Sequence, residues 1–298
     1  MVNGISDDKL EIVYISNAIA SLLSIFGCAF IISMYLIFKD LRKLAFKFIA
    51  VLGIFDLINA ISFMMPTYNK GINDEICIIQ GILMNFSTFG AILWTNFIAI
   101  ALYAIVVKSY LRIERFIKRY IIFDIFAAIA ITAIPNLLES RDSRSGFCWL
   151  YQGSYPGRYT FRFLTFLVPL WTVITINLTL YAIVFRHLRG GIGGEDAKIR
   201  KRLSQKIGIY PLIMIICYLP YTVKGIIEVQ GFWDEFSYEY YFTLIAGVVR
   251  CLIGLLNALA YGFTKSVKKK LKNLCLKKEL EDGRSTLMTN MDKKHDYN

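Results

Sequence analysis

Charged side chains that could bind an anion stand in or beside three long apolar stretches of this 298-residue sequence. Arg158 and Arg162 are four residues apart, a spacing that places both guanidinium groups on one face of a helix. Lys224 and Glu228 have the same spacing in a second stretch, and Arg250 lies in a third. Guanidinium and ammonium groups bind carboxylates and phosphates, so the four basic residues could bind an anion. Together with Glu228 they form the candidate ligand site.

Each of these residues also has a structural interpretation. Lys224 and Glu228 could form an ion pair on one helix, and the first two arginines could extend to lipid headgroups. Arg250 lies in the middle of its stretch and needs a partner or a water-filled cavity there. Asp56 and Glu228 are the candidates for that partner, and the sequence does not choose between them.

Motifs for enzymatic chemistry are few. The only histidines are His187 and His295, and no His-Glu-x-x-His, Cys-x-x-Cys or Gly-x-Ser-x-Gly pattern occurs. The glycine-rich segment 190–194 lacks the strand and the Gly-Lys-Ser/Thr ending of a phosphate-binding loop. We therefore expect a protein that is not an enzyme, with no cofactor and no metal site.

The elements that position these residues are predicted to be membrane-spanning helices. Hydrophobic residues make up 56% of the sequence and charged residues 19%, whereas soluble domains have about 45–50% and about 25%. Stretches of about 20 apolar residues can cross the hydrocarbon layer as helices. The sequence predicts an all-α fold, a bundle of seven transmembrane helices over residues 12–38, 44–65, 76–107, 120–138, 161–185, 207–230 and 238–264.

The positive charge of the chain is distributed unevenly between the segments that connect these stretches. Alternate segments hold 26 of the 34 Lys and Arg residues, and the other set holds 6. Lys and Arg accumulate on the cytoplasmic side of membrane proteins. The chain is therefore predicted to be a multi-pass membrane protein with residues 1–11 outside and the C-terminus in the cytosol. The plasma membrane is its expected location.

Two cysteines are predicted to lie on the oxidising outer side. Cys77 begins the third stretch and Cys148 lies in the loop after the fourth, while the other cysteines fall in stretches or in the cytosol. A disulfide between Cys77 and Cys148 would tie this loop across the third helix. Two free thiols are the alternative.

A basic, partly apolar surface is predicted on the cytosolic side. A partner protein could dock there, although the rule for cytoplasmic loops explains the charge without a partner. Its members are Lys108, Arg112, Arg115, Arg200, Lys201 and Arg202.

The segment after the seventh stretch has the pattern of an amphipathic helix. Residues 265–276 place apolar side chains every four residues among lysines, which is typical of a helix lying on a membrane surface against anionic lipids. Cys275 would then stand where an acyl chain can be attached, or remain unmodified. Residues 277–298 are predicted to be a disordered cytosolic tail.

Three stretches carry a family resemblance. They contain Val168-Pro-Leu-Trp171, then Ile209-Tyr-Pro-Leu212 with Cys217-Tyr-Leu-Pro220, and Gly254-Leu-Leu-Asn-Ala-Leu-Ala-Tyr-Gly262. With seven stretches and a basic third inner loop, the chain resembles a seven-helix G-protein-coupled receptor, closest to the slime-mould cyclic-AMP receptor and cyclic-AMP-receptor-like family.

The resemblance implies a receptor that couples to a heterotrimeric G protein and takes an extracellular ligand, a small anion such as a cyclic nucleotide being the candidate. Membrane lipids are expected partners and nucleic acid is not. The third stretch lacks the acidic-Arg-Tyr triplet of rhodopsin-like receptors, and Asn257-Ala-Leu-Ala-Tyr261 stands where those carry Asn-Pro-x-x-Tyr.

Two other membrane proteins fit the same topology. A retinal-binding pump needs a lysine midway along the seventh helix, and residues 238–264 contain none. A seven-span transporter built from two three-helix repeats remains the alternative function.

Overall fold

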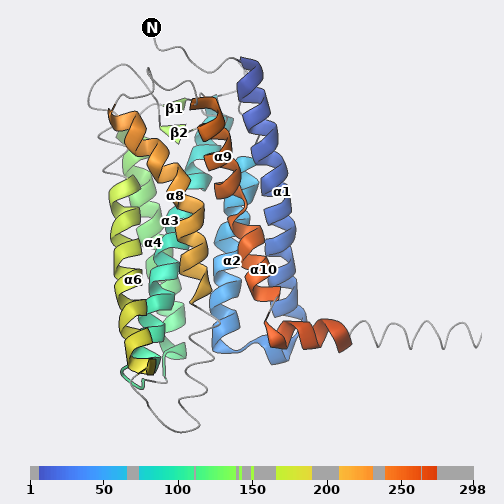
Figure 1. Cartoon of the computed structure of the whole chain (residues 1–298), viewed down its shortest axis with the longest axis vertical. Helices are drawn as coiled ribbons and strands as arrows, with labels where there is room; N and C mark the ends of the chain where they lie inside the picture. Colours follow the sequence, from blue (N-terminus) through green and yellow to red (C-terminus); the bar gives the residue numbers. More distant parts are fainter. Residues whose placement is uncertain are drawn as a thin grey trace, which may run out of the picture.

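The computed structural model describes the backbone of residues 7–65, 74–110, 112–138, 141–142, 149–150, 166–189, 208–230, 239–262 and 264–273. Long helices lying side by side make up most of this part of the chain (Figure 1). In chain order they are α1 (Asp7–Ile37), α2 (Leu44–Phe63), α3 (Asp74–Val106), α4 (Glu114–Leu138), α6 (Val168–Arg189), α8 (Ile209–Gln230), α9 (Glu239–Cys251) and α10 (Ile253–Gly262).

The bundle is apolar on the outside and contains polar groups inside. Phe26, Phe126 and Ile216 are each at least 60% exposed, while Asp56 and Arg250 are at most 2% exposed. In water this arrangement would expose a large apolar surface and bury charge, both unfavourable. In a lipid bilayer it is the expected one, because the outer surface meets hydrocarbon.

Five helical segments among the described residues are long and apolar enough to cross a membrane. They are Asp8–Ile37, Leu44–Phe63, Glu75–Val106, Val168–Arg189 and Tyr240–Tyr261. The last combines α9 and α10, and a shorter apolar helix covers Leu212–Ile227. Helix α4 differs because its first half holds five charged residues, from Glu114 to Asp124. The chain is thus a multi-pass membrane protein with several apolar spans.

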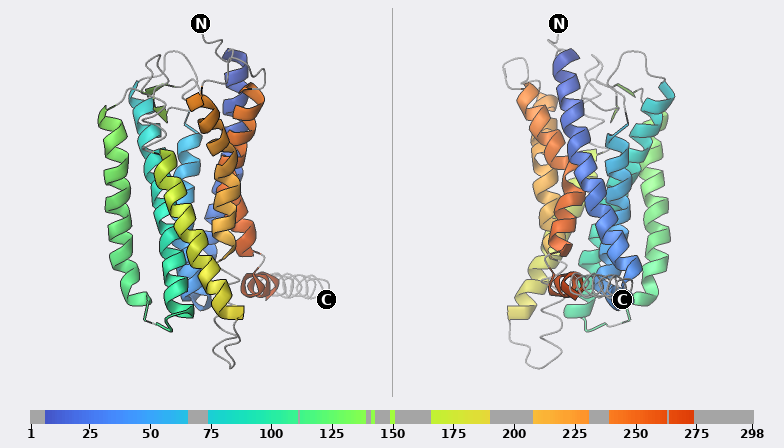
Figure 2. Two further views of the ribbon diagram at one scale, coloured as in Figure 1. Left: turned by 60° about the vertical axis from the view of Figure 1, so that its left-hand side comes forward. Right: turned by 90° about the vertical axis from the view of Figure 1, so that its right-hand side faces the viewer.

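Helix α3 is central in the packing. It contacts α2, α4 and α6, while α1 packs along α2, α9 and α10, and α8 packs against α9 (Figure 2). Trp94 of α3 is fully buried, and its indole Nε1–H donates to the carbonyl of Phe48 in α2 at 2.8 Å. This bond satisfies the one polar atom of a large buried side chain, as burial of Trp requires.

A short helix over residues 265–273 turns away from the bundle axis at the end where α6 finishes (Figure 1). Val267 is fully buried, and Lys270 donates to Asp40 of the α1–α2 connection at 2.5 Å. The hydrogen bond and positive charge of Lys270 hold the pKa of the exposed Asp40 carboxyl below its usual value. One apolar and one ionic contact therefore fasten this helix to the bundle.

Two strands of two residues lie among the helices in the described part of the chain. β1 (Arg141–Asp142) and β2 (Trp149–Leu150) pair antiparallel, with Arg141 opposite Leu150. Both strands contact α3. The all-α prediction therefore holds for the bundle but missed this ribbon, because the alternation of side chains that marks a strand needs about four residues.

Candidate functional site

Arg250 is the most deeply buried cation of the candidate site among the described residues. It lies in the last turn of α9 and is 1% exposed. Its Nη2 donates to the hydroxyl of Thr88 in α3 at 3.0 Å. Its Nε and Nη1 have no hydrogen-bond partner in the described part of the chain. The guanidinium group therefore retains donors that a further polar or anionic group could satisfy.

Four aromatic rings surround the guanidinium carbon of Arg250, and we call them the aromatic cage. Their centroids lie 4.7 Å (Tyr221), 5.3 Å (Phe63), 5.5 Å (Tyr218) and 5.5 Å (Phe166) away. All are within the range of cation–π attraction, which strengthens in a desolvated site. The rings come from α2, α8 and the turn before α6, so Arg250 lies where α2, α3, α6, α8 and α9 converge.

A chain of buried polar side chains continues from Arg250 through the bundle. Asn59 of α2 donates to Thr88 at 2.9 Å and to Ser87 at 3.0 Å. One turn along α2 from Asn59, Asp56 accepts a 2.7 Å bond from Asn257 of α10. The side chains thus connect α9 to α3, α3 to α2, and α2 to α10.

Asp56, the first of the two expected partners of Arg250, pairs with Asn257 instead. Among the described residues, Arg250 donates to Thr88 and lies against the aromatic cage. The side chain of Glu228, the second candidate, lies outside the described ones. Within the described part of the chain, no carboxylate pairs with Arg250. A buried charge without a counter-charge is costly, which makes this position a candidate for binding an anion.

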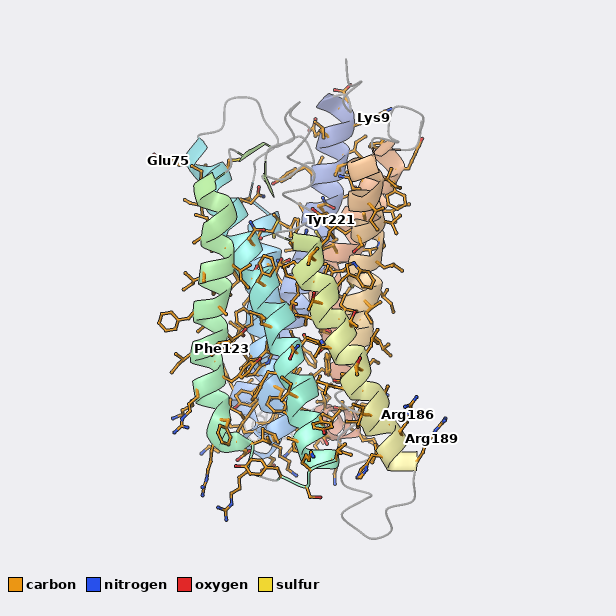
Figure 3. The ribbon with its side chains drawn as sticks, turned by 90° about the vertical axis from the view of Figure 1, so that its left-hand side faces the viewer. Lys9, Glu75, Phe123, Arg186, Arg189 and Tyr221 are labelled. Carbon is orange, nitrogen blue, oxygen red and sulfur yellow. The ribbon has the colours of Figure 1, made fainter. Side chains whose placement is uncertain are left out.

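The cage lies away from the end of the bundle that holds the surface arginines of α6. Figure 3 places Tyr221 nearer to Lys9 and Glu75 than to Arg186 and Arg189. The site therefore belongs to the half of the bundle at the Lys9 end, which the distribution of charge predicts to be extracellular.

The other predicted ligand residues are only partly described. Lys224 lies about one turn after Tyr221 in α8 and is 6% exposed. Arg158 and Arg162 lie outside the described residues. The structure thus places Arg250 where several helices meet. That Arg158 and Arg162 belong to the same site stays a prediction.

Sequence reasoning missed the aromatic cage and Thr88. Tyr218 and Tyr221 are three residues apart, and this spacing on one face of α8 was the available signal. Phe63, Thr88 and Phe166 carried no such signal, because each comes from a different segment and meets Arg250 only after the bundle has packed.

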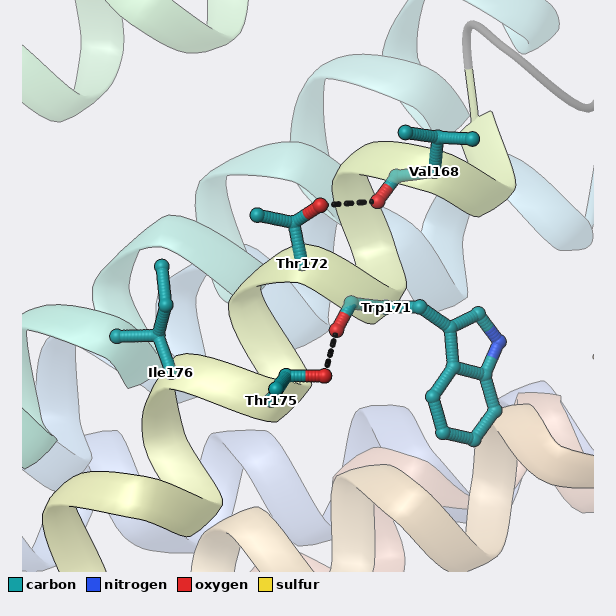
Figure 4. A pocket seen from close by; sticks show the side chains of 5 residues that line it. All are labelled: Val168, Trp171, Thr172, Thr175 and Ile176. Carbon is teal, nitrogen blue, oxygen red and sulfur yellow. Dashed lines mark hydrogen bonds between the residues drawn. The ribbon is translucent and has the colours of Figure 1, made fainter.

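A second link joins α6 to α8 beside the cage. The indole Nε1–H of Trp171 donates to the hydroxyl of Thr222 at 3.2 Å, and Thr222 donates to the carbonyl of Tyr218 at 2.8 Å. A shallow depression of about 440 Å³ lies next to it, lined by Val168, Trp171, Thr172, Thr175 and Ile176 (Figure 4).

This depression has few polar groups that could bind a charged ligand. Thr172 and Thr175 donate to the carbonyls of Val168 and Trp171 in their own helix, at 2.8 Å each (Figure 4). Val168 and Ile176 are each 42% exposed, so the depression faces outward from the bundle. Hydrocarbon chains suit such a surface, and the candidate ligand site is the one around Arg250.

Part of the predicted docking surface is visible at the opposite end. Lys108 and Arg112 lie exposed in the α3–α4 connection, and Arg115 lies exposed in the first turn of α4. Lys47 of α2 and Glu114 of α4 form an ion pair at 3.2 Å beside them. Residues 200–202 and Cys275 lie outside the described residues.

Four of the six cysteines lie in the described part of the chain. Cys28, Cys217 and Cys251 are buried free thiols. Cys77 lies in the first turn of α3, and Cys148 lies outside the described residues, directly before β2. The pairing of Cys77 with Cys148 stays a prediction.

Comparisons with known proteins give consistent results. A model of the slime mold cyclic AMP receptor family matches residues 5–240, a range that includes the aromatic cage but ends before Arg250. G-protein coupled receptor 1 of Arabidopsis thaliana is 28% identical over 276 residues, covering 89% of this chain and 82% of that protein.

Two further relatives have similar coverage of this chain. Cyclic AMP receptor-like protein A of Dictyostelium discoideum is 28% identical over 86% of this chain and 64% of its own length. G-protein coupled receptor 157 of Homo sapiens is 21% identical over 85% of this chain and 81% of its own. Because the family model covers well over half of the sequence, the chain belongs to the slime mold cyclic AMP receptor family.

Proposed function

We propose that this protein is a seven-span G-protein-coupled receptor of the plasma membrane that binds a small extracellular anion at Arg250. The observation that carries the proposal is the buried guanidinium group itself, which lies inside the aromatic cage with two donor nitrogens unpartnered among the described residues. An anion that accepts hydrogen bonds from these nitrogens would satisfy both the charge and the donors of Arg250.

The position of Arg250 supports a signalling role for such binding. A ligand shifts a conformational equilibrium only by its different affinity for the two states. An anion bonded to Nε and Nη1 of Arg250 would draw the guanidinium group toward itself and away from the aromatic cage and Thr88. The contacts among α2, α3, α8 and α9 would then differ between the free and bound receptor.

The topology is inferred from charge and helix composition. Arg186 and Arg189 extend from one end of α6 (Figure 3), and Lys265, Lys268 and Lys272 are exposed on the helix at the same end. Basic residues favour the cytoplasmic face. We place the Lys9 end outside the cell and the helix over 265–273 on the inner membrane surface, with α4 and α8 completing the seven spans.

The ligand class is tested by a panel of compounds applied to cells that express the chain. The panel contains cyclic nucleotides, small carboxylates and phosphates, and neutral compounds of similar size, and G-protein activation is the readout. We expect a response to at least one anion. A response to neutral compounds alone would contradict an anion site, and uptake by vesicles without any response would favour a transporter.

Docking of the G protein is proposed at the basic surface. Replacing Arg200, Lys201 and Arg202 together by Gln should lower maximal G-protein activation several-fold, because a positive surface attracts and orients an acidic partner. The matched control replaces Lys265, Lys268 and Lys272 by Gln, which removes the same charge elsewhere on that face. Full activation by the first variant, at normal surface expression, would refute the docking assignment.

The disulfide between Cys77 and Cys148 is part of the same proposal. Cys148 immediately precedes β2, and β2 contacts α3, whose first turn contains Cys77. Peptide mapping without reduction should recover the two cysteines in one linked peptide. Recovery of each as a separately alkylated thiol would be evidence against the pairing.

A further inference from the structure

The last span is broken between α9 and α10. Leu252 separates the two helices, although its N–H still donates to Val248 at 3.1 Å and its carbonyl accepts from Leu256 at 2.9 Å. The break comes two residues after Arg250 and five before Asn257. It therefore lies between the two buried contacts that this span makes with α3 and α2.

A hydroxyl group from α1 is inserted at the break. Ser24 is 1% exposed and donates to the carbonyl of Cys251 at 2.5 Å. The N–H of Leu255 in turn donates to the same hydroxyl oxygen at 3.1 Å. In an unbroken α-helix, that N–H and that carbonyl would be direct partners. Ser24 thus bridges one bond of the helical ladder, and a side chain inserted there is a recognised cause of a kink.

Small residues bring α1 close enough for this insertion. A Cβ atom on Gly254 would lie 2.6 Å from the sulfur of Cys28 and 3.1 Å from the Cβ of Ser24. A Cβ atom on Gly27 would lie 2.9 Å from the Cβ of Ala258. The two backbones can approach only because both positions are glycine, and Figure 2 shows α1 running beside α9 and α10.

We propose that Ser24 is a positioning residue that holds this break and thereby sets the place of Arg250 in the aromatic cage. With Ser24 in place, the orientation of α9 allows Arg250 to donate to Thr88, and the separate orientation of α10 allows Asn257 to donate to Asp56. Without the hydroxyl, Leu255 can bond directly to Cys251 and the span straightens. The consequence for ligand binding rests on the proposed function, whereas the effect on helix geometry does not.

The geometry is tested with pairs of spin labels on the full-length protein. Tyr241 and Leu259 are 58% and 46% exposed, lie on either side of the break, and can each be changed to Cys in a background with Cys275→Ser. A straight helix would place their backbones about 27 Å apart. We expect a shorter distance in the parent protein and a longer one in Ser24→Ala.

A second label pair reports where α9 lies in the bundle. Tyr241 can be paired with Phe126 of α4, which is 68% exposed. This distance should also change in Ser24→Ala, because straightening the span moves α9 and Arg250 together. Ser24→Cys, in which a thiol of similar size is a weaker hydrogen-bonding group, should shift both distances in the same direction and serves if the alanine variant folds poorly.

The matched control removes a hydroxyl whose hydrogen bond stays within one helix. Thr179 donates to the carbonyl of Thr175 in α6 at 2.8 Å and is exposed. Thr179→Ala should leave both distances unchanged. Unchanged distances in both Ser24 variants would overturn the proposal.

The response to the anion found in the panel separates the two proposals. Ser24→Ala should shift the half-maximal concentration about 2- to 30-fold, the range of mutations that alter coupling. A changed geometry with no shift in that concentration would overturn the positioning role. If no anion activates the parent protein, the proposed function fails, and the two label distances alone decide the role of Ser24.

Discussion

Replacing Arg250 by Gln should abolish most of the response to the anionic ligand while the protein still reaches the cell surface. Gln can donate to Thr88 but carries no charge to pair with an anion. Truncating one partner of a buried charge pair costs about 2–5 kcal/mol, which corresponds to a rise in the half-maximal concentration of about 30-fold or more. The measurement is a dose–response curve of G-protein activation, normalised to surface expression.

Arg250→Lys should give an intermediate response. Lysine keeps the charge but replaces the planar fork of donors with a compact ammonium group. The matched control is Lys9→Gln, because Lys9 is an exposed cation whose Nζ lies 5.3 Å from the ring centroid of Tyr240. An unchanged dose–response curve for Arg250→Gln would rule out this residue as the anion partner.

Replacing Gly90 by Ala should destabilise the bundle. A Cβ atom there would lie 2.3, 2.5 and 2.9 Å from three ring atoms of Phe55. Phe55 is only 5% exposed and packs against Phe86, so its ring has little room to withdraw. Overpacking of this kind costs about 1–3 kcal/mol, and a thermal melt of the purified protein in detergent should show a lower Tm.

The paired control for this prediction is Gly53→Ala. A Cβ atom on Gly53 would meet Ile31 at 3.4 Å, an ordinary contact, and alanine is favoured over glycine inside a helix by about 1 kcal/mol. The Tm should therefore stay the same or rise. Phe55→Leu should restore part of the Tm when combined with Gly90→Ala. If Gly90→Ala and Gly53→Ala had the same Tm, this would contradict the close packing of α2 on α3.

The apolar stretches and their charges predicted much of the fold. The requirement for about 20 apolar residues per span is a local property, and the positions of α1, α2 and α3 follow from it. The break at Leu252 was missed, because residues 238–264 are largely apolar around Arg250 and show no interruption there. Its cause is Ser24, which lies 227 residues away from Cys251 in the sequence.

The candidate site was likewise predictable from the sequence only in part. Arg250 was identifiable because a charge within an apolar stretch is costly and needs a reason. Its expected partners were carboxylates, because residue types alone suggest only that opposite charges pair. The structure instead provides Thr88, 162 residues away, and four aromatic rings.

The sequence alone determined that this chain is a mostly apolar, multi-pass helical protein whose basic residues are concentrated in alternate connecting segments. Its motifs indicated the receptor family. Composition and short spacing suffice for these properties because each helix meets the membrane independently. Only the tertiary structure decided which side chains meet inside the bundle. Contacts such as Ser24 with Cys251 and Gly90 with Phe55 depend on how the helices are rotated and packed against each other, and that arrangement is fixed by the whole bundle together.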